Sequence, residues 1–468
     1  MRIRFDRGTL VIERTDNGAS PSELPGAAWD EELAAWRVPA EQLSGIRDRI
    51  SAGRGGHADE LHVDNIHPPR ISGPWTIPPL RWYQEEAITA WRGAGDRGVL
   101  ALPTGSGKTI AAMAAIEQLG VATLVIVPTR ILLDQWARTL AACWPHPIGR
   151  LGDGEHRITR VTVATYASAV TWAPRIGDKF GLVVIDEAHH VGAWCPAEVL
   201  EMLVAPARLG LTATPPAGPG ALALERHVGP VVYGLSVAEL VGDSLADYDL
   251  FTISVMLDPA ERATYQSNRG QFAAAFAAFQ RAAPRSSWRQ FVHVSRRTMA
   301  GRAALAAWRA SRTVLAYPQG KRDAVREILA RHPGERVLVF TGDNPTAYAI
   351  ARELLVMPVT CDIRRAERVT MIDKFRSGEA PVLVSSAVLD EGFDVPDAEI
   401  AIIVGGTSSE RRHVQRIGRV LRPRPGKRAK IYELQVSATA EVEQVARRRR
   451  GLEPVTPEVA NITMRAWS

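Results

Sequence analysis

The sequence predicts an α/β protein with two parallel-sheet lobes, a small N-terminal α+β domain and a helical insertion between the lobes. Short apolar runs rich in Val, Ile and Leu alternate with helix-like stretches in two separate regions, 80–245 and 325–440. Continuously apolar strands separated by helices are typical of parallel strands that are covered on both faces. The length of 468 residues leaves room for about three domains.

Residues 1–56 are predicted to form a small domain of their own. Apolar residues alternate on both sides of Asp6-Arg7-Gly8, which predicts a β-hairpin with a glycine in its turn. A helix is expected near Pro39 to Ile50. Glycine and other small residues at Ser51–Gly56 mark the end of this domain, and residues 57–79 are predicted to be a linker.

The lobes are assigned to 80–245 and 325–440 because each contains a series of short apolar strands. Those of the first lobe are expected at Val99–Leu102, Thr123–Val127, Val161–Ala164, Leu182–Ile185 and Leu209–Thr212. Those of the second are expected at Val337–Phe340, Val382–Ser385, Ile400–Val404 and Lys430–Glu433. Residues 441–468, which include Arg447–Arg450, form an unassigned C-terminal tail.

Residues 246–324 are predicted to be a basic helical insertion between the lobes. Phe272, Phe276 and Phe279 fall on one helix face, a stripe that favours core packing, and Ala303–Trp308 predicts another helix. Residues 262–322 contain 12 Lys and Arg and no Asp or Glu, whereas the rest of the chain carries 45 basic and 51 acidic residues. Such a concentration of positive charge is typical of a surface that binds a polyanion.

Composition excludes several other classes of protein. No apolar run approaches the roughly 20 residues that a membrane helix needs, and the charged N-terminal residues do not resemble a signal peptide. The three cysteines are far apart, which excludes a zinc ribbon or a four-cysteine cluster and fits a reducing compartment. A cytoplasmic location is therefore expected.

A candidate phosphate-binding loop lies at Pro103–Thr109, between an apolar strand and a helix. Its glycines allow backbone N–H groups to curl around phosphate oxygens at the helix N-terminus. Lys108 is expected to reach the β- and γ-phosphates and Thr109 to ligate Mg²⁺, although Leu102 stands where the strict pattern has glycine. The residues expected to bind the nucleotide are Thr104, Gly105, Ser106, Gly107, Lys108 and Thr109.

Asp186 and Glu187 follow the apolar strand Leu182–Ile185. Asp186 is expected to hold Mg²⁺, and Glu187 to orient and deprotonate the attacking water. A strand that ends in two acids is by itself often only a solvated strand end. The phosphate-binding loop earlier in the same lobe favours the catalytic interpretation.

A basic segment at Gln415–Arg422 lies in the second lobe. Arg419 and Arg422 are three residues apart, so they share one helix face. Both could reach a γ-phosphate from the second lobe, where such an arginine contributes on the order of 10³–10⁵ to the rate. The alternative is a solvated basic helix face.

Taken together, these residues resemble the superfamily 2 helicases over nearly all of 80–435. Leu80–Gln84 resembles their adenine-reading motif, with Gln84 as the reader and Arg81 beside it. Thr212-Ala213-Thr214 is similar to the motif that couples hydrolysis to lobe movement. The motif V residues expected near the nucleotide are Gly392 and Asp394, and the final catalytic motif contains Gln415. The resemblance implies two RecA-like lobes that bind ATP and Mg²⁺ between them.

Within this superfamily the chain is most similar to the XPB repair helicases of archaea and bacteria. The segments that carry this resemblance are Phe5–Leu10, Trp29-Asp30, Trp36–Ala40 and Ser385–Gly392, together with an insertion where the family has its thumb. These relatives usually carry Arg-Glu-Asp, implicated in DNA opening, soon after Thr214. Here Pro215–Gly220 follows instead, so the resemblance implies ATP hydrolysis and translocation but leaves unwinding open.

DNA contacts are expected at strand ends and on the insertion. Candidate contacts to backbone phosphates are Arg130, Thr165, Thr341 and Ser386. A threonine at a strand end is more often a helix cap. On the insertion, Arg285, Arg289 and Arg296 are interleaved with Trp288 and Phe291, as in surfaces that grip a strand. The alternative is a helical core whose arginines face solvent.

The sequence thus predicts an ATP- and Mg²⁺-dependent DNA helicase or translocase. The resemblance implies 3′→5′ polarity, single-stranded or forked DNA as the partner, a role in DNA repair and a nuclease as a candidate protein partner. The oligomeric state is left open. One alternative is a duplex DNA translocase of a restriction or phage-defence system that does not unwind. The other is a catalytically silent scaffold, against which Lys108, Glu187 and Arg422 argue.

Overall fold

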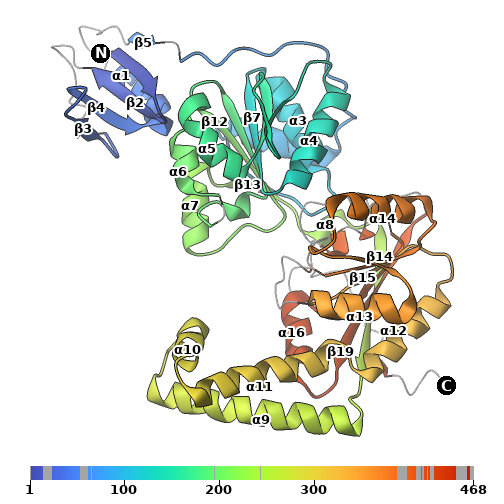
Figure 1. Cartoon of the computed structure of the whole chain (residues 1–468). Coiled ribbons are helices and arrows are strands. Elements are labelled where there is room, and N and C mark those ends of the chain that lie inside the picture. The colour runs from blue at the N-terminus through green and yellow to red at the C-terminus, as the bar shows by residue number, and fades with distance from the viewer. Residues whose placement is uncertain are drawn as a thin grey trace. The chain divides into compact units, whose positions relative to one another are not determined.

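The structure, a computed structural model, forms two compact units, Met1–Ser236 and Val237–Ser468 (Figure 1). The residues that it describes are 2–13, 24–52, 62–64, 66–193, 195–242, 244–386, 398–406, 413, 416–418, 420–421, 426–449 and 461–463. Each unit is built around one large sheet, and each is described separately below. No described helix is long and apolar enough to cross a membrane.

The N-terminal part of the first unit is a small sheet with one helix against it. Its strands are β1 (Arg2–Asp6), β2 (Thr9–Glu13), β3 (Ala28–Asp30), β4 (Ala35–Pro39) and β5 (His62–Asp64), in the order β3-β4-β2-β1-β5. The predicted hairpin is confirmed, because β1 and β2 pair antiparallel around a turn where Arg7 and Gly8 have positive φ. Helix α1 (Leu43–Ala52) confirms the helix expected in this region and adds Leu43 and Ile46 to the core.

The rest of the first unit is an eight-stranded sheet in the order β13-β6-β12-β11-β7-β10-β8-β9. Its strands are β6 (Arg97–Ala101), β7 (Thr123–Val127), β8 (Gly149–Gly152), β9 (Glu155–Arg157), β10 (Val161–Thr165), β11 (Leu182–Asp186), β12 (Ala207–Thr212) and β13 (Val231–Gly234). All neighbouring pairs are parallel except β8 with β9. The five strands predicted for the first lobe are therefore confirmed as one parallel sheet.

Helices connect and cover these strands (Figure 1). They are α2 (Trp82–Gly93), α3 (Lys108–Leu119), α4 (Arg130–Cys143), α5 (Tyr166–Ile176), α6 (Ala197–Glu201) and α7 (Pro219–His227), with a short 3₁₀ turn at η3 (Ala188–His190). A second 3₁₀ turn, η2 (Ala40–Gln42), belongs to the N-terminal part. Strands β7, β10, β11 and β12 are buried along their whole length. Such burial on both faces explains why these strands read as uninterrupted apolar runs.

The second unit has a seven-stranded sheet in the order β16-β17-β15-β18-β19-β14-β20, and every pair is parallel. The strands are β14 (Asp247–Val255), β15 (Val337–Phe340), β16 (Met357–Val359), β17 (Val382–Ser385), β18 (Ile400–Ile403), β19 (Arg428–Val436) and β20 (Asn461–Thr463). Its helices include α8 (Val237–Leu240), α12 (Gln319–Arg331), α13 (Asn344–Leu354), α14 (Arg365–Ser377) and α16 (Ala440–Arg448). The four strands predicted for this lobe are confirmed.

Strand β14 differs from the expectation that residues 246–324 are helical. It pairs with β19 over nine residues, from Asp247 with Arg428 to Val255 with Val436. Its first half is only partly buried and begins with the acidic residues Asp247 and Asp249, so it lacks the continuous apolar run by which the other strands were found. The chain thus completes part of the second sheet before it enters the helical segment.

The helical insertion consists of α9 (Pro259–Ala282), α10 (Trp288–Ser295) and α11 (Met299–Ala316), and α9 lies along α11 (Figure 1). Phe272, Phe291 and Leu305 form its buried core, against which Phe276 and Phe279 pack. The phenylalanine stripe is therefore packing, as expected. The role expected for Phe291 in gripping DNA is wrong, because its side chain is buried, whereas Trp288 is 40% exposed.

Candidate functional site

The loop between β6 and α3 is held by hydrogen bonds from its side chains to its own backbone carbonyls. Gly105 and Gly107 have φ of +90° and +79°, the left-handed region that glycine enters at little cost. The Ser106 hydroxyl donates a hydrogen bond to the Pro103 carbonyl at 2.7 Å. Lys108 Nζ donates to the carbonyls of Leu102 and Pro103 at 2.9 and 3.1 Å, so its ammonium group lies over the start of the loop.

Helix α2 brings Gln84 against this loop. The buried Gln84 side chain donates from Nε2 to the carbonyls of Ser106 (2.9 Å) and Gly107 (3.2 Å). Tyr83 donates from its hydroxyl to the same Ser106 carbonyl at 2.6 Å, and Arg81 Nη1 donates to that hydroxyl at 3.2 Å. A Cβ on Gly107 would lie 2.6 Å from Gln84 Nε2. The structure therefore joins the predicted adenine-reading segment to the predicted phosphate-binding loop.

Asp186 ends β11 with its carboxylate held on both oxygens. Trp136 Nε1, on α4, donates to Asp186 Oδ2 at 2.8 Å, and the Glu187 backbone N–H donates to Oδ1 at 3.0 Å. Burial raises the pKa of Asp186, and the negative charge of Glu187 adds to the rise, to about 6. Trp136 was not predicted, because its sequence context shows only an aromatic residue on an amphipathic helix.

Glu187 follows in the left-handed conformation, at φ +50°. Its Oε2 lies 3.3 Å from His189 Nδ1, which is also 3.1 Å from Thr212 Oγ1 at the end of β12. Burial alone would raise the pKa of Glu187, but the hydrogen bond to His189 and the positive charge of Lys108 outweigh it and lower that pKa. Two adjacent carboxyl groups thus have pKa values displaced in opposite directions, a pattern of sites that divide chemical roles.

Residues at the carboxyl end of β12 contact both the loop before Lys108 and the loop after Asp186. The Thr212 carbonyl accepts a hydrogen bond from Leu102 N at 3.0 Å, and Thr212 Oγ1 accepts one from Thr214 N at 3.2 Å. The loop before Lys108 and the loop after Asp186 are therefore both held by the carboxyl end of β12. Ligand sites of parallel sheets lie at this edge.

In the second unit, Thr341 and Ser386 lie close together, after β15 and β17. Thr341 is buried and donates from its backbone N–H to the Ser385 carbonyl and from Oγ1 to the Asp343 carbonyl, both within 2.9 Å. Arg416, which was not predicted, donates from Nη2 to the carbonyls of Thr341 and Ser386, each at 3.1 Å. The predicted residues Gly392, Asp394, Gln415, Arg419 and Arg422 lie outside the described residues.

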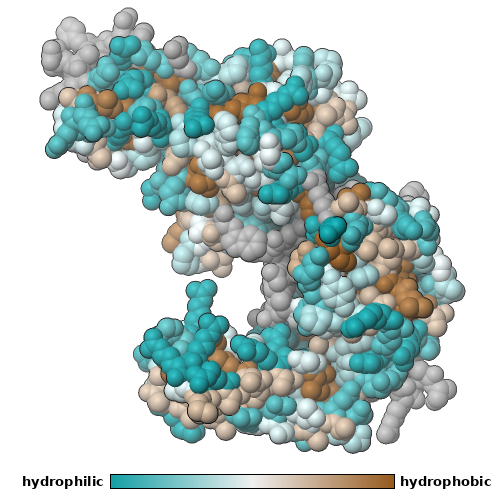
Figure 2. Space-filling model, viewed as in Figure 1, coloured by the Kyte–Doolittle hydropathy of each residue, from teal (hydrophilic) through white to brown (hydrophobic). Residues whose placement is uncertain are grey.

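The remaining predicted DNA contacts are on the surface or in helix caps. Arg130 is exposed and forms an ion pair with Asp153 at 2.9 Å. Thr165 is the N-cap of α5 and accepts a hydrogen bond from Ser168 N, which is the cap role weighed against DNA contact. Arg285, Arg289 and Arg296 are exposed on the insertion. Figure 2 shows a mainly hydrophilic surface around α10, which carries Arg289.

Family models match three stretches of the chain. Residues 3–51 match the Xeroderma pigmentosum group B helicase damage recognition domain, residues 77–217 the res subunit of type III restriction enzymes, and residues 320–424 the helicase conserved C-terminal domain. The chain is 35% identical, over 96% of its length and 99% of the relative, to the DNA 3'-5' translocase XPB2 of Sulfurisphaera tokodaii. The chain belongs to the XPB family of superfamily 2 helicases. The resemblance predicted from the motifs is confirmed.

Other relatives agree with this assignment. The XPB-family chain is 27% identical to the DNA 3'-5' helicase XPB of Mycobacterium tuberculosis, over 96% of this chain and 72% of the relative. It is similar in fold to the Hef helicase domain of Pyrococcus furiosus, with a TM-score of 0.53, 19% identity and coverage of 79% of this chain and 98% of that one. The predicted α/β fold with RecA-like lobes is confirmed, and the protein is an ATP-dependent DNA helicase or translocase.

The raised pKa of Asp186 predicts that its ionised carboxylate destabilises the folded chain near neutral pH. Between about pH 4 and pH 6 the folded chain holds the Asp186 proton more tightly than the unfolded chain does, so stability falls as pH rises through this window. Asp186→Asn cannot accept from both Trp136 Nε1 and the Glu187 N–H, and this penalty is the same at every pH. Because the variant also lacks the titrating carboxyl group, we expect its free energy of unfolding relative to wild type to rise by about 2 kcal/mol between pH 4.5 and pH 7.5.

Denaturant titration of the protein without nucleotide or Mg²⁺ measures this effect at both pH values. Asp153→Asn, at the partly exposed partner of Arg130, is the matched control and should change stability little at either pH. A stability difference between Asp186→Asn and wild type that is the same at pH 4.5 and pH 7.5 would contradict the prediction.

Proposed function

We propose that this XPB-family protein hydrolyses ATP at the carboxyl edge of the first sheet and uses it to move 3′→5′ along DNA during repair. The proposal rests mainly on one observation. Lys108, the loop Pro103–Gly107 that Gln84 contacts, and the buried Asp186–Glu187 pair all lie at the same edge of the sheet. Their chemistry matches the needs of phosphoryl transfer, which are positioning, charge neutralisation and one base.

Each predicted residue takes a role in this proposal. Gln84 and Arg81 bind the adenine side, the N–H groups of Thr104 to Gly107 hold phosphate oxygens, and Lys108 neutralises the β- and γ-phosphates. From the second unit, the residues assigned to the nucleotide by resemblance are Gly392, Asp394, Gln415, Arg419 and Arg422. Arg419 and Arg422 would stabilise charge that develops on the γ-phosphate.

The two residues predicted to hold Mg²⁺ have side chains whose chemistry fits this cation. The Thr109 hydroxyl and the Asp186 carboxylate are oxygen donors, which this cation prefers. A cation there would also relieve the buried negative charge that raises the pKa of Asp186. When bound, Mg²⁺ supplies charge neutralisation to the phosphates.

Glu187 is the proposed general base. Because Lys108 and His189 lower its pKa, its carboxylate is ionised near neutral pH and can take a proton from the attacking water. The proposed role of His189 is to orient Glu187, because its Nδ1 lies 3.3 Å from Glu187 Oε2 and 3.1 Å from Thr212 Oγ1.

The exposed arginines of the insertion are the proposed DNA grip. Arg285, Arg289 and Arg296 lie in a stretch without acidic residues, beside the partly exposed Trp288, which suits a backbone contact without sequence readout. Arg130 offers a further phosphate contact. Thr165, Thr341 and Ser386 have internal hydrogen bonds, so their contacts to DNA would come from loop backbone or from rearranged side chains.

A second candidate function is translocation on duplex DNA without unwinding, in a restriction or phage-defence system. The run from Pro215 to Gly220, which stands where the Arg-Glu-Asp triplet is usual in the family, favours it. Strand displacement and triplex displacement assays on the same preparation separate the two functions.

ATP hydrolysis measured in parallel with single-stranded DNA, duplex DNA, forked DNA and RNA identifies the nucleic acid that stimulates the enzyme. Absence of stimulated hydrolysis with all four would indicate a catalytically silent scaffold. A nuclease partner remains part of the proposed function, because cleavage of the DNA would require a separate nuclease.

We expect Glu187→Gln to bind ATP with nearly wild-type affinity and to hydrolyse it at least about 100-fold more slowly, because general-base catalysis contributes roughly 10²–10⁴. Equilibrium binding of a fluorescent ATP analogue and steady-state hydrolysis measure the two effects. Exchange of the exposed Glu155 for Gln is the control. Wild-type turnover in Glu187→Gln would remove the base assignment.

We expect simultaneous exchange of Arg285, Arg289 and Arg296 for Gln to weaken DNA binding and to flatten its salt dependence. Each lost phosphate contact should reduce the slope of log K against log salt by about 0.7–0.9. Fluorescence anisotropy with a labelled oligonucleotide at several salt concentrations measures the slope. Exchange of the exposed Arg326, Arg331 and Arg376, which lie outside the insertion and form ion pairs, is the control. A slope equal to that of wild type would exclude contact of the three insertion arginines with phosphate.

A further inference from the structure

The N-terminal sheet is packed against the first large sheet within the same compact unit. Val204, from the segment before β12, is part of the buried core of the N-terminal sheet. A Cβ on Gly8 would lie 2.6 Å from Met202 Cγ, and one on Gly177 would lie 2.9 Å from Phe5 Cζ. The contact between the two parts is therefore a close-packed interface.

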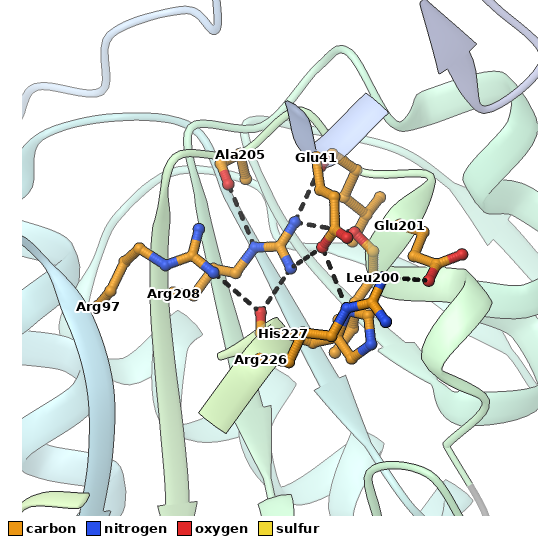
Figure 3. Close-up of polar contacts among 9 residues, drawn as sticks. Glu41, Arg97, Leu200, Glu201, Ala205, Arg208, Arg226 and His227 are labelled. Atoms are coloured by element: carbon orange, nitrogen blue, oxygen red, sulfur yellow. Dashed lines mark hydrogen bonds and ion pairs between the residues drawn. The ribbon is translucent and has the colours of Figure 1, made fainter. Parts of the chain in front are cut away.

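A charged network lies in this interface (Figure 3). Arg208, near the start of β12, is completely buried and donates from Nη1 to Glu41 Oε2 at 3.2 Å and to the His227 carbonyl at 2.5 Å. Its Nη2 donates to the carbonyls of Leu200 and Leu203 at 2.8 and 3.1 Å. Glu41 comes from η2 of the N-terminal part, and its Oε2 also lies 3.2 Å from His227 Nδ1.

Glu41 supplies the charge that balances this network. Among the described ion pairs, Arg208 has one carboxylate partner, Glu41. Burial lowers the pKa of Arg208 to about 10, and the nearby Arg97 lowers it as well, whereas Glu41 opposes the change. A buried guanidinium that loses its counter-charge is strongly unfavourable. The buried charge of Arg208 is therefore balanced by a residue of the N-terminal part.

Glu201 lies at the edge of the same cluster (Figure 3). It pairs with the exposed Arg226 at 3.7 Å. Ligand atoms of Glu41, Glu201 and His227 lie within 4.8 Å of one another, but the guanidinium groups of Arg208 and Arg226 already supply positive charge there. The cluster is therefore better explained as an ion-pair network than as a metal site.

The other end of β12 reaches the proposed ATP site. Thr212 is four positions after Arg208, a span of about 13 Å along a strand, and β12 is buried throughout. Thr212 Oγ1 contacts His189, the partner of Glu187, and the Thr212 carbonyl holds Leu102, whose own carbonyl accepts from Lys108. Close-packed interiors transmit displacement instead of absorbing it.

We propose that Glu41 is a positioning residue for ATP hydrolysis, which acts through Arg208 and β12 on the His189–Glu187 pair. The N-terminal domain then influences the rate of ATP hydrolysis through its contact with the first large sheet, in addition to any contact that it makes with DNA. This inference rests on the proposed role of Glu187 as the base.

The test compares Glu41→Gln with Glu201→Gln in the full chain. Glu41→Gln keeps the size of the side chain and one acceptor oxygen, and it removes the negative charge. For both variants, kcat and KM for ATP are measured with saturating DNA, and amide hydrogen exchange is followed in β12 and in the N-terminal sheet.

We expect Glu41→Gln to lower kcat about fivefold, the lower end of usual coupling between sites. KM for ATP should stay unchanged, because the contacts of Gln84 with the loop do not involve β12, and exchange in β12 should rise. Glu201→Gln should alter neither kcat nor exchange in β12. If Glu41→Gln exchanges faster in the N-terminal sheet but keeps the wild-type kcat, the contact between Glu41 and Arg208 is structural only, and the proposal is overturned. Wild-type kcat together with wild-type amide exchange would overturn it as well.

If Glu41→Gln destabilises the first unit, the double variant Glu41→Gln/Arg208→Met removes the unpaired charge. A refolded double variant with wild-type kcat would also overturn the proposal, and one with low kcat would support it. A wild-type protein without ATP hydrolysis would instead refute the proposed function. In that case, the exchange of β12 amides in Glu41→Gln still tests the link between Glu41 and β12.

Discussion

Two carboxylates buried side by side at the end of β11 are the constraint on which the site depends. Asp186 and Glu187 cannot both carry full charge there without compensation, and the pKa of Asp186 rises to about 6 as a result. Lys108, the indole N–H of Trp136 and the imidazole of His189 supply part of that compensation. Under the proposed function, a bound cation would supply the rest.

The sheet makes this arrangement possible because its parallel strands bring their carboxyl ends to one edge. Strand β12 lies between β6 and β11, so a single buried strand holds both the phosphate-binding loop and the acidic loop. Its opposite end carries Arg208, which contacts the N-terminal part. The same strand therefore links the proposed ATP site with the part of the chain that matches the XPB damage recognition domain.

The strands and the glycine-containing loop before Lys108 could be predicted because their signals are local, namely uninterrupted apolar runs and glycines before Lys108. Strand β14 was missed because its acidic start and partial burial leave no such run. Trp136, Arg208 and Arg416 were missed for another reason. Each acts through contacts with residues far away in the sequence, such as Trp136 with Asp186 and Arg208 with Glu41, and no pattern of neighbours indicates which distant carboxylate or carbonyl a side chain will meet.

Steady-state ATP hydrolysis by wild type and by Lys108→Ala, each with saturating DNA, tests the central claim most directly. Lys108 is the charged side chain shared by the phosphate-binding loop and the acidic pair. The account predicts DNA-stimulated hydrolysis in wild type, and in Lys108→Ala a rate at the background without enzyme together with retained DNA binding. Hydrolysis by Lys108→Ala at the wild-type rate would contradict it.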